Sequence, residues 1–225
     1  MELLTRWSGL QSGGPGRPFV TYYDVATGER TELSGTTTAN WVAKTANLLV
    51  DEFDAEPATR VEVALPTHWL RIVCILATWA VGGTVVDADG EVFVAGPDTA
   101  EQPTGARHRV ASALLPFARP FPTAPAGVVD LGVALPGQPD AFFPLDQPTD
   151  QVPAVDVAGL ALTYGELETG IPPSSHRLLL TPGTLARDVT ATLAAALGGG
   201  SIVLVSGASP ADVDRLAGQE QAQPA

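Results

Sequence analysis

A threonine and a histidine directly follow a short apolar run that has the composition of a buried strand. The run is Val61–Leu65, Pro66 closes it, and Thr67 and His68 come next. Ligands of α/β proteins bind at the carboxyl ends of parallel strands, and a helix N-terminus keeps a histidine neutral. Thr67 and His68 are therefore candidate ligand-binding residues. The competing interpretation of His68 is a partly exposed residue in a first helical turn, because a lone histidine without a nucleophile or metal partner makes no catalytic site.

Two aspartates end the next apolar run, Thr84–Val86. We expect Asp87 and Asp89 at the same edge of the sheet as His68, where paired carboxylates could hold a metal or act as acid and base. The stretch Asp-Ala-Asp-Gly is also typical of a tight turn, since aspartate and glycine favour turn geometry. Asp87 is kept as a candidate ligand-binding residue, and no metal site is predicted.

The third candidate position lies at the end of the predicted strand 177–181 in the C-terminal third. Here Thr181 is followed by a proline and then by Gly183. Threonine before proline is an ordinary helix start, with threonine as the N-cap and proline at the first helical position. The pattern thus predicts a helix from this point through Leu197. Because they also follow a strand, Thr181 and Gly183 are further candidate ligand-binding residues.

The sequence lacks the familiar catalytic motifs. It has no G-x-S-x-G, no H-E-x-x-H and no phosphate loop ending in Gly-Lys-Ser/Thr. Its single cysteine, Cys74, allows no internal disulfide and is typical of a small buried hydrophobe. His108 and His176 are expected at the surface beside strand starts. We predict no catalytic residue.

Alternating strands and helices must position these candidates. The residues 61–65, 69–81 and 84–86 predict a strand, a helix and a parallel strand, since parallel strands need a crossover of a dozen or more residues. The crossover helix is apolar on most of its circumference, with Arg71 its only charge, so we expect it to lie against a sheet. The C-terminal third repeats this unit. The alternation predicts an α/β fold, a mostly parallel sheet flanked by helices.

Shorter patterns predict the remaining elements. Thr163 and Glu166 have the spacing of a capping box, which accounts for the segment Tyr164-Gly165-Glu166. The other predicted helices are a helical turn within 1–18, a helix over 35–53 capped by Ser34, a short helix over 97–102 and a last helix from Ser209-Pro210. The other predicted strands are a hairpin over 19–33, a strand over 91–95 after a tight turn, and strands near 109–115, 160–162 and 202–205.

Prolines set one segment apart. We expect a single truncated domain over 1–225, with lobes 1–115 and 154–218 joined by the proline-rich segment 116–153, which can be neither a long helix nor a central strand. It is either a linker or an ordered surface loop. The loop is favoured because four phenylalanines could anchor it by being buried, namely Phe117, Phe121, Phe142 and Phe143.

Composition limits the partners. The chain of 225 residues has 25 acidic and 12 basic residues, for a formal net charge of −13. Nucleic acid and anionic membrane surfaces would be repelled by such a field, although the excess can also serve solubility alone. The N-terminus shows no secretory pattern and the longest apolar helix is too short to span a bilayer, so a cytoplasmic location is expected.

Three stretches together resemble the N-terminal part of the adenylate-forming superfamily, the AMP-binding, acyl-CoA synthetase-like enzymes. The passage from Arg30 to Leu49 is similar to the family's opening hairpin and helix, the stretch Ala64–Trp69 to its strand-end turn, and Leu76–Asp87 to its helix-to-strand passage, with Asp87 where the family usually has proline. Leu193–Val205 resembles a later passage of the family. The segment 114–144 also resembles a small actinobacterial group of short chains.

Departures from that family decide the expected function. The resemblance implies an ATP-binding loop rich in serine, threonine and glycine and followed by lysine, but Thr181-Pro182-Gly183-Thr184 lacks the second glycine and the lysine. The family's C-terminal lobe with its catalytic lysine is not recognisable, and Lys44 is the only lysine. We therefore expect a degenerate relative that does not adenylate carboxylates and is a ligand-binding or protein-interaction module.

The alternative is an active acid–thiol ligase, completed by a partner chain. ATP or AMP enters as a cofactor only through the resemblance. The sequence leaves three partners possible: a nucleotide, an acyl group or a protein.

Overall fold

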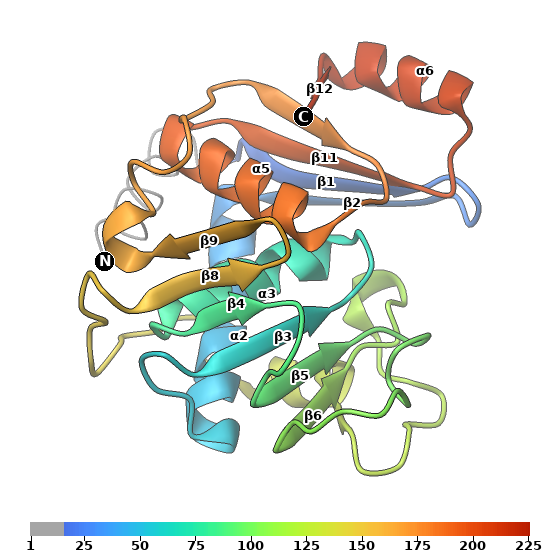
Figure 1. Cartoon of the computed structure of the whole chain (residues 1–225). Helices are drawn as coiled ribbons and strands as arrows, with labels where there is room; N and C mark the ends of the chain where they lie inside the picture. The colour runs from blue at the N-terminus through green and yellow to red at the C-terminus, as the bar shows by residue number, and fades with distance from the viewer. Residues whose placement is uncertain (1–15) are drawn as a thin grey trace. The chain divides into compact units, whose positions relative to one another are not determined.

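Strands and helices alternate through residues 16–225, the part of the chain that the computed structural model describes (Figure 1). The predicted mostly parallel α/β fold is confirmed, with the strands divided between two sheets. Each sheet contains one antiparallel pair, at one of its edges. The helical turn expected within 1–18 falls mainly on residues 1–15, outside the described residues.

The chain divides into two compact units that interleave in sequence. Unit 1 comprises 16–39, 67–72 and 167–225, and unit 2 comprises 40–66 and 73–166. The expected lobes 1–115 and 154–218 were continuous in sequence, so their boundaries differ from these. The single truncated domain stays a prediction.

Unit 1 contains the five-stranded sheet. Its strands, in spatial order, are β12 (Gln223–Pro224), β10 (Arg177–Leu180), β11 (Ser201–Ser206), β1 (Pro18–Asp24) and β2 (Glu29–Ser34). The predicted hairpin is confirmed as the antiparallel pair β1–β2, and β11 runs parallel to both β1 and β10. Helices α5 (Leu185–Gly198) and α6 (Pro210–Glu220) cover opposite faces of this sheet (Figure 1).

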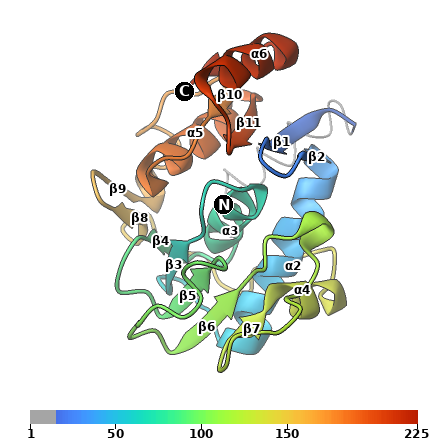
Figure 2. The same ribbon diagram turned by 90° about the vertical axis from the view of Figure 1, so that its right-hand side faces the viewer.

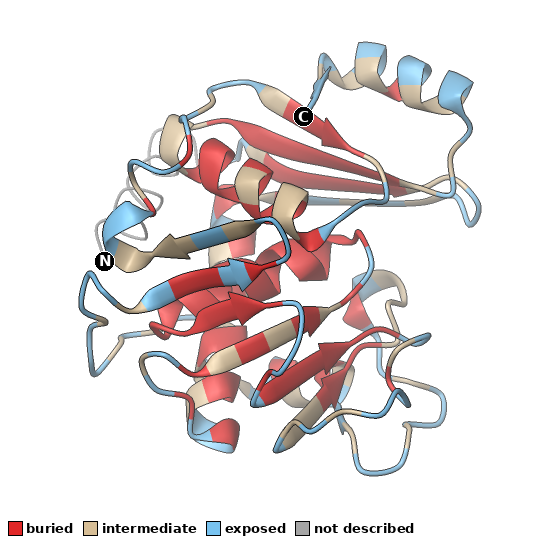
Figure 3. Ribbon diagram, in the orientation of Figure 1, coloured by how far each residue is buried: buried red, intermediate tan, exposed pale blue. Residues whose placement is uncertain are grey.

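Side-chain alternation explains this layering. Val203 and Val205 of β11 pack with Leu216 of α6, and the alternate residues of β11 point to the other face. Strands β1, β10 and β11 are largely buried, whereas the outer side of α6 is exposed (Figure 3). As predicted, α6 begins after Ser209, whose hydroxyl and the Asp212 carboxylate form a capping box.

Unit 2 contains the seven-stranded sheet. Its order is β7 (Val129–Asp130), β6 (His108–Ala111), β5 (Val92–Ala95), β3 (Arg60–Ala64), β4 (Thr84–Val86), β8 (Pro153–Val157) and β9 (Leu160–Thr163). The predicted parallel pairing of β3 with β4 is confirmed. Strand β5 lies on the other side of β3, parallel to it, so the turn before it joins no hairpin.

Two long helices each contain residues of both units. Helix α2 (Gly35–Phe53) begins in unit 1 and continues in unit 2, as does α3 (Trp69–Ala80). Their unit 2 portions lie on one face of the seven-stranded sheet (Figure 2), where Leu48, Cys74 and Val94 line a small apolar cavity. Ser34 caps α2 as predicted, accepting a hydrogen bond from the Thr37 amide. No helix among residues 16–225 is long and apolar enough to cross a membrane, and the cytoplasmic location stays a prediction.

The proline-rich segment is ordered around small elements rather than around its phenylalanines. It contains η1 (Pro116–Ala118), α4 (Leu131–Ala134) and η2 (Leu135–Gly137), and Leu131 and Leu135 are buried. The expectation that all four phenylalanines anchor it was wrong, because Phe117 is 90% exposed and Phe143 is 82% exposed. The aliphatic side chains of α4 and η2 take the buried positions instead.

Two local predictions were also wrong. Residues 97–102 form turns and no helix. Helix α5 begins at Leu185 rather than at Pro182, because Thr184 and not Thr181 is its N-cap, with the Thr184 hydroxyl accepting a hydrogen bond from the Arg187 amide. Gly199 ends this helix in the left-handed conformation, as the glycine run predicts. A third short helix, η3 (Tyr164–Glu166), follows β9.

Candidate functional site

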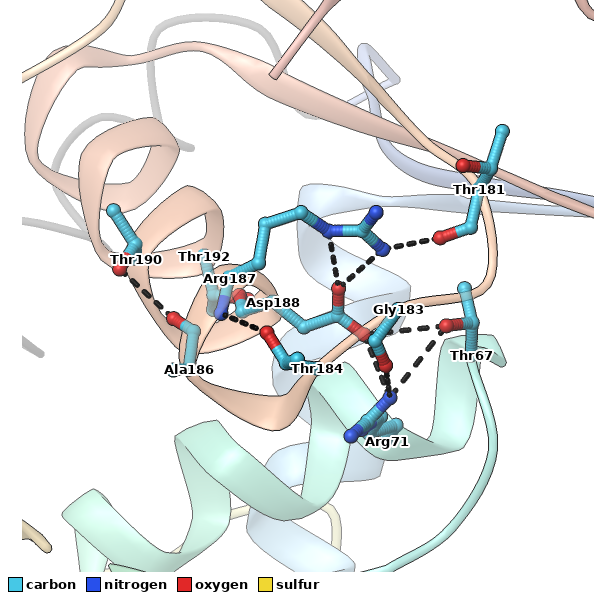
Figure 4. Close-up of polar contacts among 10 residues, drawn as sticks. All are labelled: Thr67, Arg71, Thr181, Gly183, Thr184, Ala186, Arg187, Asp188, Thr190 and Thr192. Atoms are coloured by element: carbon cyan, nitrogen blue, oxygen red, sulfur yellow. Dashed lines mark hydrogen bonds and ion pairs between the residues drawn. The ribbon is translucent and has the colours of Figure 1, made fainter. Parts of the chain in front are cut away.

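A buried ion pair joins α3 to α5 within unit 1. Arg71 Nη1 lies 2.9 Å from Asp188 Oδ2, and their side chains are 8% and 0% exposed. On the other carboxylate oxygen, Arg187 Nη2 lies 2.9 Å from Oδ1 and its Nε donates to the same oxygen at 3.3 Å. Figure 4 shows the two guanidinium groups on either side of the carboxylate. The Asp188 carboxylate thus forms ion pairs with two guanidinium groups in a site from which most water is excluded.

The helix starts bring these groups together. Thr184 caps α5, which places Arg187 and Asp188 in its first turn, beside the start of α3. Thr192 closes the next turn by donating from its hydroxyl to the Asp188 carbonyl at 2.6 Å. A carboxylate in the first turn of a helix is favoured by the helix dipole.

Three of the predicted site residues belong to this same cluster. Thr67 Oγ1 donates to Asp188 Oδ2 at 3.4 Å, and the Gly183 carbonyl accepts from Arg71 Nη1 at 3.3 Å. The Thr181 carbonyl accepts a hydrogen bond from Arg187 Nη2. The structure therefore brings Thr67, Thr181 and Gly183 together. It engages the Thr67 hydroxyl and the Thr181 and Gly183 carbonyls with protein groups.

These contacts do not fit a triphosphate held by the Thr181–Thr184 loop. The loop carbonyls face the guanidinium groups, and the Thr184 hydroxyl caps its own helix. A Cβ added to Gly183 would meet the Arg187 guanidinium at 2.5 Å, so the space beside this glycine is already filled. Amide groups that cradle phosphate need an open concave surface.

Burial controls the charges of the cluster. It raises the pKa of Asp188, while Arg71 and Arg187 oppose that shift. It lowers the pKa of Arg71, and the Asp188 charge opposes that change. An arginine remains a cation under these conditions. A carboxylate with no exposed surface and two cationic partners is placed to hold α3 and α5 together rather than to take a proton from a substrate.

His68 is buried, which contradicts the interpretation of a partly exposed residue. It is 2% exposed, and its Nδ1 accepts a hydrogen bond from the Leu70 amide at 3.2 Å. Its ring contacts Tyr22 edge-on, with centroids 4.5 Å apart. Burial lowers the pKa of His68 to about 3, so the imidazole is neutral at physiological pH. The His68 imidazole is therefore neutral as predicted, but the main cause is burial rather than the helix N-terminus.

Asp87 belongs to unit 2, whereas Thr67 and His68 belong to unit 1. Its Oδ2 accepts a hydrogen bond from the Ala158 amide at 2.8 Å, which connects the end of β4 to the turn after β8. Asp89 has φ of 55°, a left-handed turn conformation. Both observations agree with turn chemistry. Among residues 16–225, no three His, Cys, Asp or Glu side chains are grouped closely enough to hold a metal ion.

Two other segments have structural roles. The Glu166 carboxylate accepts from the Thr163 amide at 2.9 Å, as the capping-box interpretation predicts, and the Tyr164 hydroxyl donates to the Gly83 carbonyl at 2.8 Å. His176 is exposed, as expected. His108 begins β6, as expected, and is half-buried, with its ring tilted against that of Phe53 at a centroid distance of 5.1 Å.

Comparisons with known proteins place the chain in a family. It is 33% identical over 220 residues to a "TIGR03089 family protein" of Mycobacterium tuberculosis, covering 92% of this chain and 90% of that protein. The chain belongs to the TIGR03089 family. No family model matches the sequence.

Solved structures relate the TIGR03089 fold to larger enzymes. The acyl-CoA synthetase of Brucella canis aligns with a TM-score of 0.75 at 16% identity, over 97% of this chain and 46% of that one. The acetoacetyl-CoA synthetase of Streptomyces lividans aligns with a TM-score of 0.72 at 21% identity, over 98% and 41%. The likeness is one of fold, and this chain spans less than half of either enzyme. The fold that the resemblance to adenylate-forming enzymes implies is thereby confirmed.

Arg71 and Asp188 are the site residues that sequence reasoning missed in this TIGR03089 family member. Arg71 is the only charge of an otherwise apolar helix, and a buried charge needs a partner. The opposite signs of the two could have indicated their pairing. Nothing in the local pattern indicates that residues 117 positions apart meet.

Proposed function

We propose that this chain is an acyl-CoA synthetase-like domain that acts by binding a protein partner and does not adenylate carboxylates. The proposal rests on one observation. Asp188, Arg71 and Arg187 engage the Thr67 hydroxyl, the Gly183 carbonyl and the Thr181 carbonyl, in the residues predicted as ligand-binding.

The lysine chemistry of adenylate-forming enzymes also has no counterpart at this loop. Thr184 is followed by Leu185, Ala186 and Arg187 and by no lysine, and the Arg187 guanidinium is shared between Asp188 and the Thr181 carbonyl. Lys44, the only lysine of the sequence, belongs to unit 2, where its Nζ lies 3.0 Å from Asp140 Oδ1. These engagements support a fold retained without its phosphate contacts.

A protein partner fits the charge of the chain better than a polyanion. The net charge of −13 repels nucleic acid and anionic lipid surfaces. It also weakens the encounter with free ATP. Large apolar side chains that remain exposed, such as Leu145 at 92%, are features of interaction surfaces.

The deciding experiment is ATP–pyrophosphate exchange with a panel of fatty and aryl acids. We expect background rates for the purified chain, because the Thr181 and Gly183 carbonyls bind the two guanidinium groups and the Thr184 hydroxyl caps α5. Thermal shift with ATP, AMP and acyl-CoA should show no stabilisation. Robust exchange that His68→Ala or Asp87→Ala abolishes would overturn the proposal. Exchange that needs a second chain would favour the alternative of a ligase completed by a partner.

A further inference from the structure

The segment 138–148 of unit 2 is held against α2 at its start. The Lys44 ammonium group pairs with Asp140 and donates to the Gln138 carbonyl. The Asn47 side-chain amide donates to the Pro139 and Ala141 carbonyls at 3.1 and 3.0 Å. Four contacts from one helix thus fix the backbone just before Phe142.

The far end of the segment is held by packing. A Cβ added to Gly82 would lie 3.1 Å from Cδ of Pro148, so the proline ring already packs close to this glycine. Gly82 has φ of 78°, which favours glycine and lets the chain turn sharply after α3. The residues between the two ends are therefore presented in a defined position.

Two large apolar side chains project from this fixed segment. Phe143 is 82% exposed and Leu145 is 92% exposed. Burying a side chain of this size removes a large apolar area from water and is favourable. Two such residues on one anchored segment indicate a surface that is covered in a complex.

These side chains border a groove of about 320 Å³. Its apolar part comes from Val50, Ala55, Pro57 and Val81, together with the exposed segment. Its volume lies at the lower end of the range of about 300–1,000 Å³ that is common for small-molecule pockets, which is enough space for a few side chains. The groove can therefore accept anchor residues of a partner.

The charges on the groove select the partner. Three carboxylates line it, those of Asp54, Glu56 and Asp146, and none of its described lining residues is basic. Asp54 pairs with Arg107 at 3.4 Å, but both side chains are more than 70% exposed, so this contact is weak. A second copy of the chain, with its own net charge of −13, would bring like charges together.

We propose that this groove binds a basic amphipathic segment of another protein. Apolar side chains of that segment cover Phe143 and Leu145, and its lysines or arginines pair with Asp54, Glu56 and Asp146. The inference names the partner chemistry for the binding role proposed above and rests on that role.

The test uses a fluorescein-labelled synthetic peptide of alternating Leu, Phe and Lys clusters and the full chain, measured by fluorescence anisotropy. Phe143→Ser and Leu145→Ser should each weaken binding at least tenfold, and Asp146→Lys should weaken it severalfold and reduce its salt dependence. The matched controls are Phe117→Ser, an apolar residue 90% exposed outside the groove, and Glu101→Lys, an exposed charge outside it. Both controls should bind like the wild type.

Each other outcome overturns the inference. No binding by the wild type, equal loss in Phe117→Ser and Phe143→Ser, or equal binding of a peptide whose Leu and Phe are replaced by Ser would each do so. Concentration-dependent dimerisation that Phe143→Ser abolishes would assign the groove to a second copy. The exchange assay is separate, so failure of the groove and failure of the proposed function can be distinguished.

Discussion

His68 connects the buried start of α3 to the pH dependence of stability. Its pKa falls from the ordinary 6.5 to about 3 on folding, because burial disfavours the charged ring. The unfolded chain therefore binds a proton at this site between pH 6.5 and 3 that the native chain does not. Stability present above pH 6.5 is lost as the pH falls through this window.

The variant His68→Asn tests this effect. The asparagine side-chain oxygen can replace Nδ1 as the acceptor for the Leu70 amide, but it does not titrate. Between pH 6.5 and 4.5 the free energy of unfolding of the wild type should fall by about 1.4 kcal/mol per pH unit more steeply than that of the variant. Urea unfolding at several pH values measures the difference, and parallel curves would contradict the buried neutral histidine.

Arg71 and Asp188 test the buried ion pair. Arg71→Met leaves a fully buried carboxylate with one cation fewer and should cost about 3–5 kcal/mol of unfolding free energy. The double variant Arg71→Met with Asp188→Leu should recover much of this loss, since Arg187 is 30% exposed and can turn to water. Arg107→Gln, at an exposed pair, is the control and should change stability by less than about 0.5 kcal/mol. A double variant no more stable than Arg71→Met would show that the pair contributes through more than charge compensation.

At the scale of elements, helix ends decide where α5 presents its charges. Had Thr181 been the cap, Arg187 and Asp188 would lie a turn further into the helix. The observed cap at Thr184 places them in the first turn, beside Arg71. The choice between two threonines three residues apart thus decides which turn of α5 carries Arg187 and Asp188.

Two glycines in unit 1 helices should respond oppositely to alanine. Gly199 has φ of 71° at the end of α5, so Gly199→Ala should cost about 1 kcal/mol. Gly218 is exposed within α6, and an added Cβ would meet no atom within 4 Å, so Gly218→Ala should stabilise by about 0.5–1 kcal/mol. Thermal unfolding of both variants measures the two shifts, and a loss at Gly218 would contradict the helical position assigned to it.

At the scale of the whole molecule, the excess of acidic residues keeps copies of the chain apart by charge repulsion. With a sequence pI of about 4.4, the chain loses its net charge on mild acidification, and the repulsion between copies disappears. The exposed Phe143 and Leu145 should then promote self-association. Light scattering should rise near pH 4.4, and less for Phe143→Ser than for the wild type. Equal scattering would separate this patch from the aggregation.

Local sequence determined most of the elements of this protein. The apolar runs, the proline and glycine positions and the capping residues predicted the hairpin, α2, α3, α6 and the parallel pair β3–β4, because these depend on neighbours within a few residues. The resemblance to adenylate-forming enzymes rests on the same stretches. Of the candidate site, Thr67, Thr181 and Gly183 were identified by their places at strand ends.

Only the tertiary structure decided what those candidates contact. The partner of Arg71 is Asp188, 117 residues away, and the two side chains also engage the Gly183 carbonyl and the Thr67 hydroxyl. The division of the strands into two sheets and the exposure of Phe143 likewise depend on which distant segments pack together. A hydrophobic pattern specifies that a face is buried. It does not specify against what, because the burial free energy is non-directional and the choice of partner is made by shape and charge in the folded chain.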